Sequence, residues 1–307
     1  MNHFVLQKLI GRSHECDYPK TFVEGVAILT SQKTHFNENS ANPAKDIDEQ
    51  VRAAISSGNS LYNLDTDKLQ ALTPDVILTQ SLCDVCSIDL VTVERVVKRM
   101  KMPSVVLDLN PKTLQEVLND VIKIGEAIGC EEGASQVVTS LKERVKIAAG
   151  RNSTTDTRPG VGFIEWTDPI FVGGHWTPEI IELAGARHPL NKAGGKSKTI
   201  SDEDFAKSDP DIIIVAPCGM SLEKTRELVE IIQKDEKRKA WFENLRAVKQ
   251  NKVVLVDGNE MFNRPGPRLV DALEFCASLV EAFGTLKDTD AFEAGSLNPT
   301  RFPWAPL

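Results

Sequence analysis

The chain has 307 residues, 41% of them hydrophobic and 26% charged, which is typical of a globular protein with room for two domains of about 100–200 residues. Its 44 acidic and 36 basic residues give a net charge of −8, which argues against nucleic-acid binding, and no apolar stretch approaches the roughly 18 residues of a membrane span. The first ten residues lack the basic start and apolar core of a signal peptide. We therefore expect a cytoplasmic location and no membrane insertion.

Residues 1–111 are expected to form an N-terminal α/β lobe. Its predicted elements are a strand at 26–30, a helix at 47–56, a helix-strand step around Pro74, a helix at 91–100 and a strand at 104–108. A connecting helical segment is predicted at 112–150, because apolar residues recur there at i, i+3, i+4 spacing. Gly129 and Gly133 are expected to break it into two helices.

Residues 151–285 are expected to form a C-terminal α/β lobe, followed by a tail at 286–307 that lies along the surface. The predicted elements of this lobe are a strand at 161–166, a helix at 178–183, a second helix-strand step around Pro210, helices at 222–233 and 241–244, a strand at 253–256 and a helix at 268–283.

The two helix-strand steps repeat one pattern. Residues 69–78 and 205–214 each combine a short amphipathic helix, a Pro-Asp pair and a run of β-branched residues, and a cysteine follows, Cys83 or Cys218. Proline ends the helix, and the apolar run is typical of a strand covered on both faces. The repeat predicts two similar Rossmann-like lobes with mainly parallel sheets. Ligands of such sheets bind beyond the carboxyl ends of the strands, which predicts a site between the lobes.

Side chains with binding chemistry gather at these predicted strand ends and in loops. The candidate ligand-binding residues are His14, Glu15, Cys16, Tyr18, Cys83, Cys86, Trp166, Gly173, Gly174, His175, Trp176, Cys218, Asn263, Arg264 and Arg268. Each also has a plain structural interpretation: His14 as a brace for its turn, the cysteines as buried thiols and the tryptophans as core residues. A single Cys-x-x-Cys pair is a weak metal signal, and Gly173-Gly174 fits neither a dinucleotide fingerprint nor a Walker loop.

Three motifs carry a family resemblance. Residues 11–19 (GRSHECDYP), 173–179 (GGHWTPE) and 263–268 (NRPGPR) resemble the cobalamin-binding branch of the helical-backbone periplasmic binding proteins, the vitamin B12 and siderophore receptors of ABC importers. The resemblance covers roughly residues 8–285.

The resemblance implies two small lobes joined by one long rigid helix, with a corrinoid held in the cleft. It implies that Trp166, Gly174, His175 and Trp176 face the ligand, with residues 14–18 and 81–86 lining lobe one and residues 263–268 forming the remaining wall. Family members usually begin with another strand before the first motif, whereas only ten residues precede Gly11 here. Lobe one is therefore expected to lack its first strand.

The first functional hypothesis is non-catalytic binding of cobalamin or a related corrinoid. Imidazole is a good ligand for transition metals, so His175, whose flanking glycines allow close approach, or else His14, is expected as an axial contact to cobalt. Arg264 and Arg268 would meet amide side chains or a phosphate of the ligand. The transporter or chaperone that would receive the ligand is not identified by the sequence.

Two alternatives belong to other classes. A cytosolic metal or tetrapyrrole handler would use a soft-ligand cluster for zinc or iron, formed by Cys16, Cys83, Cys86 and Cys218. An enzyme acting on a corrinoid would use Glu15 or Asp17 as acid or base and a cysteine as nucleophile. The enzyme ranks last, because the sequence places no base beside a nucleophile.

Overall fold

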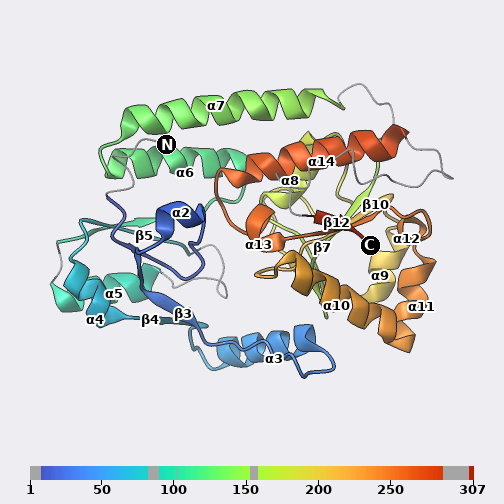
Figure 1. Cartoon of the computed structure of the whole chain (residues 1–307), viewed down its shortest axis with the longest axis horizontal. Helices are drawn as coiled ribbons and strands as arrows, with labels where there is room; N and C mark the ends of the chain where they lie inside the picture. The colour runs from blue at the N-terminus through green and yellow to red at the C-terminus, as the bar shows by residue number, and fades with distance from the viewer. Residues whose placement is uncertain (1–7, 82–89, 102, 153–157, 286–303) are drawn as a thin grey trace. The chain divides into compact units, whose positions relative to one another are not determined.

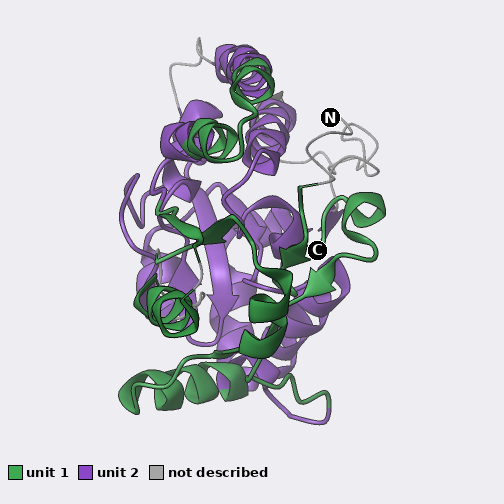
Figure 2. Ribbon diagram, turned by 90° about the vertical axis from the view of Figure 1, so that its left-hand side faces the viewer, with its two compact units in different colours: residues 1–38, 46–110, 120–136 green, residues 39–45, 111–119, 137–307 purple. Residues whose placement is uncertain are grey.

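The computed structural model describes residues 8–81, 90–101, 103–152, 158–285 and 304–307, which form two compact units (Figures 1 and 2). We call them lobe one and lobe two and describe each by itself. Lobe one comprises residues 1–38, 46–110 and 120–136, and lobe two comprises residues 39–45, 111–119 and 137–307. Two short segments, 39–45 and 111–119, thus belong to lobe two although the sequence assigned them to the N-terminal lobe and the connector.

Lobe one contains three separate two-stranded sheets. Its strands are β1 (Gly11–Arg12), β2 (Ala27–Ile28), β3 (Thr30–Gln32), β4 (Tyr62–Leu64), β5 (Val76–Thr79) and β6 (Val105–Asp108). Its helices are α2 (Lys20–Val23), α3 (Pro43–Ser56), whose first residues belong to lobe two, α4 (Thr66–Leu72) and α5 (Leu90–Met100). The pairs β1–β2 and β5–β6 are parallel, whereas β3–β4 is antiparallel. Each predicted element of this lobe is present, with bounds shifted by a few residues.

The connecting segment consists of two helices, α6 (Leu114–Ala127) and α7 (Glu131–Gly150). Gly129 has a φ of 63° and lies between them, which confirms the predicted break at this glycine. Gly133 lies inside α7 and breaks nothing. Helix α7 begins in lobe one and continues into lobe two, and α6 likewise contains residues of both lobes.

Lobe two is built on one six-stranded sheet in the order β12-β11-β10-β7-β8-β9. Its strands are β7 (Val161–Thr167), β8 (Ile170–Val172), β9 (Lys198–Ile200), β10 (Ile212–Val215), β11 (Val253–Val256) and β12 (Trp304–Pro306). The three central strands β7, β10 and β11 are parallel, and the outer three pair antiparallel. The mainly parallel centre is the arrangement that the sequence predicts.

Helices cover both faces of this sheet (Figure 1). They are α8 (Thr177–Leu183), α9 (Asp202–Lys207), α10 (Leu222–Lys234), α11 (Glu236–Asn244), α12 (Arg246–Lys249), α13 (Gly258–Met261) and α14 (Arg268–Thr285). Ile214 faces side chains of α8 and α14, whereas Ile213 and Val215 pack with residues of α9, α10 and α11. All residues of β10 and β11 are buried, as expected for strands covered on both faces.

The internal repeat is confirmed. In both copies a short helix, α4 or α9, leads through a Pro-Asp pair into a parallel strand, β5 or β10. The residue before each proline adopts a left-handed backbone conformation, with φ of 43° at Thr73 and 39° at Asp209. The two copies therefore share the backbone path as well as the sequence pattern.

The C-terminal end differs from the surface tail that the sequence predicts. Residues 304–306 form β12, which pairs antiparallel with β11 at the edge of the sheet, and Trp304 is only 6% exposed. The preceding residues of the predicted tail lie outside the described part. Among the helices described here, none has both the length and the apolar character needed to cross a membrane.

Candidate functional site

His14 lies within the first motif of lobe one and is fixed there by hydrogen bonds to Thr30. Its backbone N–H donates to Thr30 Oγ1 at 3.0 Å, and its Nδ1 lies 2.6 Å from the same oxygen. Its ring packs near Tyr62, with ring centroids 5.5 Å apart. Nε2 lies 3.5 Å from a carboxylate oxygen of Glu15. Because Thr30 occupies Nδ1, Nε2 is the ring nitrogen through which His14 would meet a ligand.

The rest of this motif forms a tight turn around the Arg12 side chain. The Arg12 guanidinium donates to the carbonyl oxygens of Ser13 at 3.3 Å and Cys16 at 3.0 Å. Cys16 is exposed, and the Tyr18 side chain is 55% exposed. Residues 11–16 and Tyr18 line a cavity of about 1070 Å³ within lobe one. The structure thus brings the four lobe-one candidates of this motif to the wall of one cavity.

The second predicted lobe-one segment is described only at its first residue. Ser81 follows β5, and its N–H donates to Asn110 Oδ1 at 2.7 Å while its hydroxyl donates to Asp108 Oδ1 at 3.0 Å. These bonds tie the ends of the parallel strands β5 and β6 together. Cys83 and Cys86 lie outside the described residues, so their roles stay predictions.

In lobe two, the ends of the parallel strands β7, β10 and β11 lie together as expected. The N–H of Cys218, just after β10, donates to the carbonyl oxygen of Glu165 near the end of β7 at 3.0 Å. A Cβ placed on Gly258, just after β11, would lie 2.5 Å from the carbonyl oxygen of Pro217 and 2.2 Å from Asn263 Oδ1. The candidates Cys218 and Asn263 therefore belong to one cluster at the carboxyl ends of these strands.

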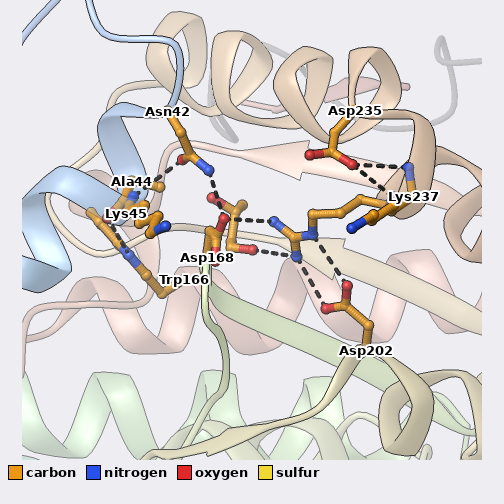
Figure 3. Close-up of polar contacts among 10 residues, drawn as sticks. Asn42, Ala44, Lys45, Trp166, Asp168, Asp202, Asp235 and Lys237 are labelled. Carbon is orange, nitrogen blue, oxygen red and sulfur yellow. Dashed lines mark hydrogen bonds and ion pairs between the residues drawn. The ribbon is translucent and has the colours of Figure 1, made fainter.

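Trp166 at the end of β7 contacts the first turn of α3 (Figure 3). Its indole N–H donates to the carbonyl oxygen of Ala44 at 3.1 Å, and the Asn42 amide donates to Asp168 Oδ2 at 2.6 Å. The Arg238 guanidinium lies 3.4 Å from that carboxylate oxygen and donates to both oxygens of Asp202 at 3.2 Å. The polar edge of Trp166 is therefore used to hold a neighbouring segment of the chain.

The glycine-rich loop after β8 is fixed by contacts inside lobe two. A Cβ on Gly173 would lie 2.7 Å from the Phe163 ring, and one on Gly174 would lie 2.3 Å from Ser197 N. The Gly174 N–H donates to Ser197 Oγ at 3.2 Å, and that hydroxyl donates to Glu165 Oε2 at 3.0 Å. The space beside these two glycines is thus filled by other parts of the protein itself and not left for a ligand.

His175 follows these glycines in a left-handed conformation, with a φ of 51°. Its N–H donates to the carbonyl oxygen of Gly195 at 2.6 Å, and its carbonyl accepts from Gly194 N at 2.9 Å. The imidazole is half-buried, and burial lowers the pKa of His175, with Lys196 and Lys112 acting in the same direction. The neutral imidazole, the form that binds metals, is therefore favoured at neutral pH.

The side chains of Trp176, Arg264 and Arg268 differ in solvent exposure. Trp176 is 4% exposed, and its indole N–H donates to the carbonyl oxygen of Phe262 at 2.7 Å, so it acts as a core residue in this structure. Arg268 Nη1 lies 3.4 Å from Glu260 Oε2, and its side chain is 20% exposed. Arg264 is partly buried beside the Asn263 turn.

Three residues outside the predicted ligand-binding set support this region. Ser197 links the glycine-rich loop to β7, as described above. His188 is buried, its Nδ1–H donates to the Val161 carbonyl oxygen at 2.9 Å, and burial lowers the pKa of its imidazole. Glu179, two residues into α8, accepts from Leu114 N at 2.5 Å, and burial raises the pKa of this carboxyl. The sequence signal for the loop that carries His188 and Ser197 is its content of glycine and lysine at residues 185–198.

The described residues contain no group of three or more His, Cys, Asp or Glu side chains arranged to hold a metal ion. The alternative cluster of Cys16, Cys83, Cys86 and Cys218 includes two residues outside the described part and stays a prediction. Cys276 is a buried core residue, and burial raises the pKa of its thiol to about 12.

Comparison with known proteins identifies the family to which the chain is similar. A family model described as "Periplasmic binding protein" matches residues 29–260. A lipoprotein of Bacillus subtilis (strain 168), the uncharacterized ABC transporter substrate-binding lipoprotein YvrC, is 30% identical over 226 residues, which are 71% of this chain and 65% of the relative. The chain thus spans less than two thirds of the length of that relative.

Solved structures share the fold at low sequence identity. The periplasmic vitamin B12 binding protein BtuF of Vibrio cholerae matches with a TM-score of 0.62 and 17% identity, covering 91% of each chain. The periplasmic heme-binding protein RhuT from Roseiflexus sp. RS-1, in apo form, matches with a TM-score of 0.65 and 15% identity, covering 92% of this chain and 94% of the other. These likenesses support the two-lobed α/β fold.

The expected cytoplasmic location is wrong. The matching family consists of periplasmic binding proteins, and the curated relative is a substrate-binding lipoprotein, which indicates a location outside the cytoplasm. The sequence-based expectation failed because it rested on the first ten residues alone. A family of binding proteins agrees with the expectation of a chain that is not an enzyme.

Proposed function

Because the chain belongs to the periplasmic binding protein family, we propose that it binds a metal-bearing macrocycle, a corrinoid first among them, and delivers it to an ABC importer. The observation that carries this proposal is the state of His175. Its half-buried imidazole is held neutral, and two lysines, Lys112 and Lys196, lie near enough to influence it. A neutral imidazole is a metal ligand, and nearby ammonium groups favour an anionic part of the same ligand, such as a phosphate.

Several features of lobe two support a preformed site. The loop that carries His175 is fixed through Ser197 and Glu165, and its conformation leaves Gly174 no room for a side chain. A binding site on a preorganised loop loses little conformational entropy when the ligand binds. In lobe one, His14 offers a second imidazole whose Nε2 is oriented by the bond from Nδ1 to Thr30.

A haem-type tetrapyrrole is the second candidate. Its iron would accept the same imidazole, and its propionates would suit the same two lysines, since carboxylates pair with ammonium groups. RhuT, which shares the fold, is a periplasmic heme-binding protein. The two candidates differ in the metal and in the acidic group, and a direct titration separates them.

The experiment is a UV–visible titration of the purified chain with aquocobalamin and, separately, with hemin. The proposal expects a saturable shift of the absorption bands with one of them, weakened at least about tenfold in His175→Ala because a metal–imidazole contact is lost. The matched control is His35→Ala, which removes an exposed imidazole of lobe one. Equal binding by wild type and His175→Ala would move the contact away from His175, and an absence of shifts with both ligands would overturn the proposal.

A further inference from the structure

The first turn of α6 is held by a side chain of α8. The N–H of Leu114, the first residue of α6, donates to Glu179 Oε2 at 2.5 Å, across 65 positions of the chain. Leu114 is buried and Glu179 is partly buried, so this bond is shielded from water. Both residues belong to lobe two. The start of the connecting segment is therefore fixed to the helix that follows the glycine-rich loop.

The other contacts at this end of α6 form a capping box. The hydroxyl oxygen of Thr113 accepts from Glu116 N at 3.2 Å, and Glu116 Oε2 accepts from Lys112 N at 2.5 Å. The first N–H groups of a helix have no acceptor inside it, and the helix dipole favours a carboxylate at that end. Glu179 supplies such an acceptor to Leu114 from another element. The backbone N–H groups of Lys112 and Leu114 are thus both bonded to carboxylates.

The chain between His175 and Glu179 is fixed as well. Trp176 and Thr177 are only 4% and 3% exposed, and the Trp176 indole N–H is hydrogen-bonded inside the lobe. A short buried segment therefore links the imidazole to the Glu179 carboxylate, and that carboxylate holds the backbone beside Lys112. The position of Lys112 relative to His175 is set by this chain of contacts.

The Lys112 side chain can reach a ligand. It is exposed, and within the described part of the chain no carboxylate forms an ion pair with its ammonium group. Its charge also reaches the imidazole, because burial, Lys196 and then Lys112 lower the pKa of His175, in that order. An ammonium group near an imidazole that binds a metal can pair with an acidic group of the same ligand.

We propose that Glu179 is a positioning residue of this site: by capping α6 it holds Lys112 beside His175, so that one ligand meets the imidazole with its metal and Lys112 with a phosphate or carboxylate. The identity of the ligand rests on the proposed function, whereas the placement of Lys112 by Glu179 does not. Such a site favours a macrocycle with an acidic group over the same macrocycle without one.

The first test needs no ligand. The backbone amide resonance of His175 is recorded by NMR in wild type, Lys112→Met, Glu179→Met and the double variant. We expect Lys112→Met to shift this resonance when Glu179 is present. In the Glu179→Met background the shift should fall below about half, because Lys112 is no longer held in place. Equal shifts in both backgrounds, or no shift in either, would overturn the proposal.

The second test is the affinity for whichever of aquocobalamin and hemin the wild type binds, measured by absorption titration. Loss of one contact between an ammonium group and an anion should weaken binding about fivefold in Lys112→Met, and by a similar factor in Glu179→Met. The double variant should also lose about fivefold rather than about 25-fold, because Glu179 acts through Lys112. Additive losses would overturn the proposal.

Ligands without the acidic group test the specificity. Cobinamide lacks the phosphate of cobalamin, and the dimethyl ester of hemin lacks its free carboxylates. Wild type and Lys112→Met should bind these analogues with equal affinity, because the group that pairs with the ammonium is absent. A fivefold loss that persists with the analogue would overturn the pairing of Lys112 with an acidic group.

Two variants of α8 serve as controls. Glu179→Gln keeps an oxygen that accepts from Leu114 N, so it should retain the wild-type resonance shifts and affinity. Glu182→Ala removes an exposed carboxylate of the same helix and should change neither. A loss in Glu179→Gln as large as that in Glu179→Met would overturn the positioning role. If Glu179→Met does not fold, Glu179→Ala takes its place. If the wild type binds neither macrocycle, the proposed function fails, while the resonance shifts still decide whether Glu179 places Lys112.

Discussion

Asn42 and Asp168 lie 126 positions apart, yet the Asn42 side-chain amide donates a 2.6 Å hydrogen bond to the Asp168 carboxylate. The same carboxylate pairs with Arg238, whose side chain is 13% exposed. The Trp166 indole N–H donates to the carbonyl oxygen of Ala44, two residues after Asn42. Residues 39–45 are therefore part of lobe two by specific contacts, and α3 begins on that lobe. The end of β7 acts as an anchor for this segment.

The anchor predicts a stability loss on Asp168→Ala. The variant removes the bond to Asn42 and one partner of a largely buried guanidinium, so we expect a loss of about 1–3 kcal/mol in the free energy of unfolding, measured by urea denaturation. Glu203→Ala is the control, since it breaks an exposed pair with Lys207 and should cost under about 0.5 kcal/mol. Similar losses in both variants would show that the Asp168 contacts carry no particular weight.

The packing around Gly174 predicts that Gly174→Ala is poorly tolerated. The new methyl group would collide with backbone atoms of residues 195–197, which cannot move aside like a flexible side chain. Overpacking of this kind costs about 1–3 kcal/mol. Gly133→Ala is the matched control, because nothing lies within 4 Å of its added Cβ and alanine favours a helix by up to about 1 kcal/mol. Thermal denaturation of the two variants should show shifts of opposite sign, and a stable Gly174→Ala would contradict this account of the loop.

The lowered pKa of His175 predicts a dependence of stability on pH. In the unfolded chain the imidazole takes up a proton near its ordinary pKa of 6.5, whereas the folded protein resists protonation because the ring is half-buried. Its neutral form thus contributes stability that is fully present above pH 6.5 and is lost as the pH falls through the lower, folded pKa. We expect His175→Gln to lose less stability than wild type between pH 7.5 and pH 5, measured by urea midpoints.

His188 is shifted in the same direction and remains in that variant, so part of the wild-type dependence should persist. The difference between the two proteins isolates His175. Identical pH dependence in wild type and His175→Gln would contradict the burial of the imidazole.

The attachment of α7 to lobe two predicts an effect of Arg144→Gln. The guanidinium bonds Glu274 at 2.8 Å through two nitrogens and also bonds Asp271, both on α14, and these partners raise the pKa of Arg144. Glutamine leaves two partly buried carboxylates without their cation, so we expect a loss of about 1–3 kcal/mol, seen in chemical denaturation. Lys142→Gln, on an exposed position of the same helix, should be close to neutral. A neutral Arg144→Gln would show that α7 is held by its apolar face alone.

The elements of the fold were largely predictable because their signals are local. The Pro-Asp steps at Pro74 and Pro210 end a helix and start a strand by the properties of proline, and the apolar run of β10 marks a strand buried on both faces. Strand β12 was missed because the signal in residues 304–306 is too short: three residues, two of them Ala and Pro, that become a strand only beside β11.

The candidate site was predictable in its residue types but less so in their partners. The sequence predicts that the glycines beside His175 allow close approach of a ligand, whereas the structure shows that Ser197 and its neighbours occupy the space beside Gly174. Likewise Trp176 and Trp166 were chosen as rare aromatic residues near strand ends, and nothing local indicates that their indole groups bond Phe262 and Ala44. Contacts between residues far apart in sequence leave no local signal, so these roles are visible only in the folded protein.

The unequal burial of β5 and β10 also bears on how the chain responds to heat. The heat-capacity increment of unfolding scales with the apolar surface that becomes exposed, and lobe two, with its doubly covered sheet, holds most of that surface. Lobe one has less apolar surface to expose, so we expect it to contribute the smaller part of the heat-capacity increment measured by calorimetry.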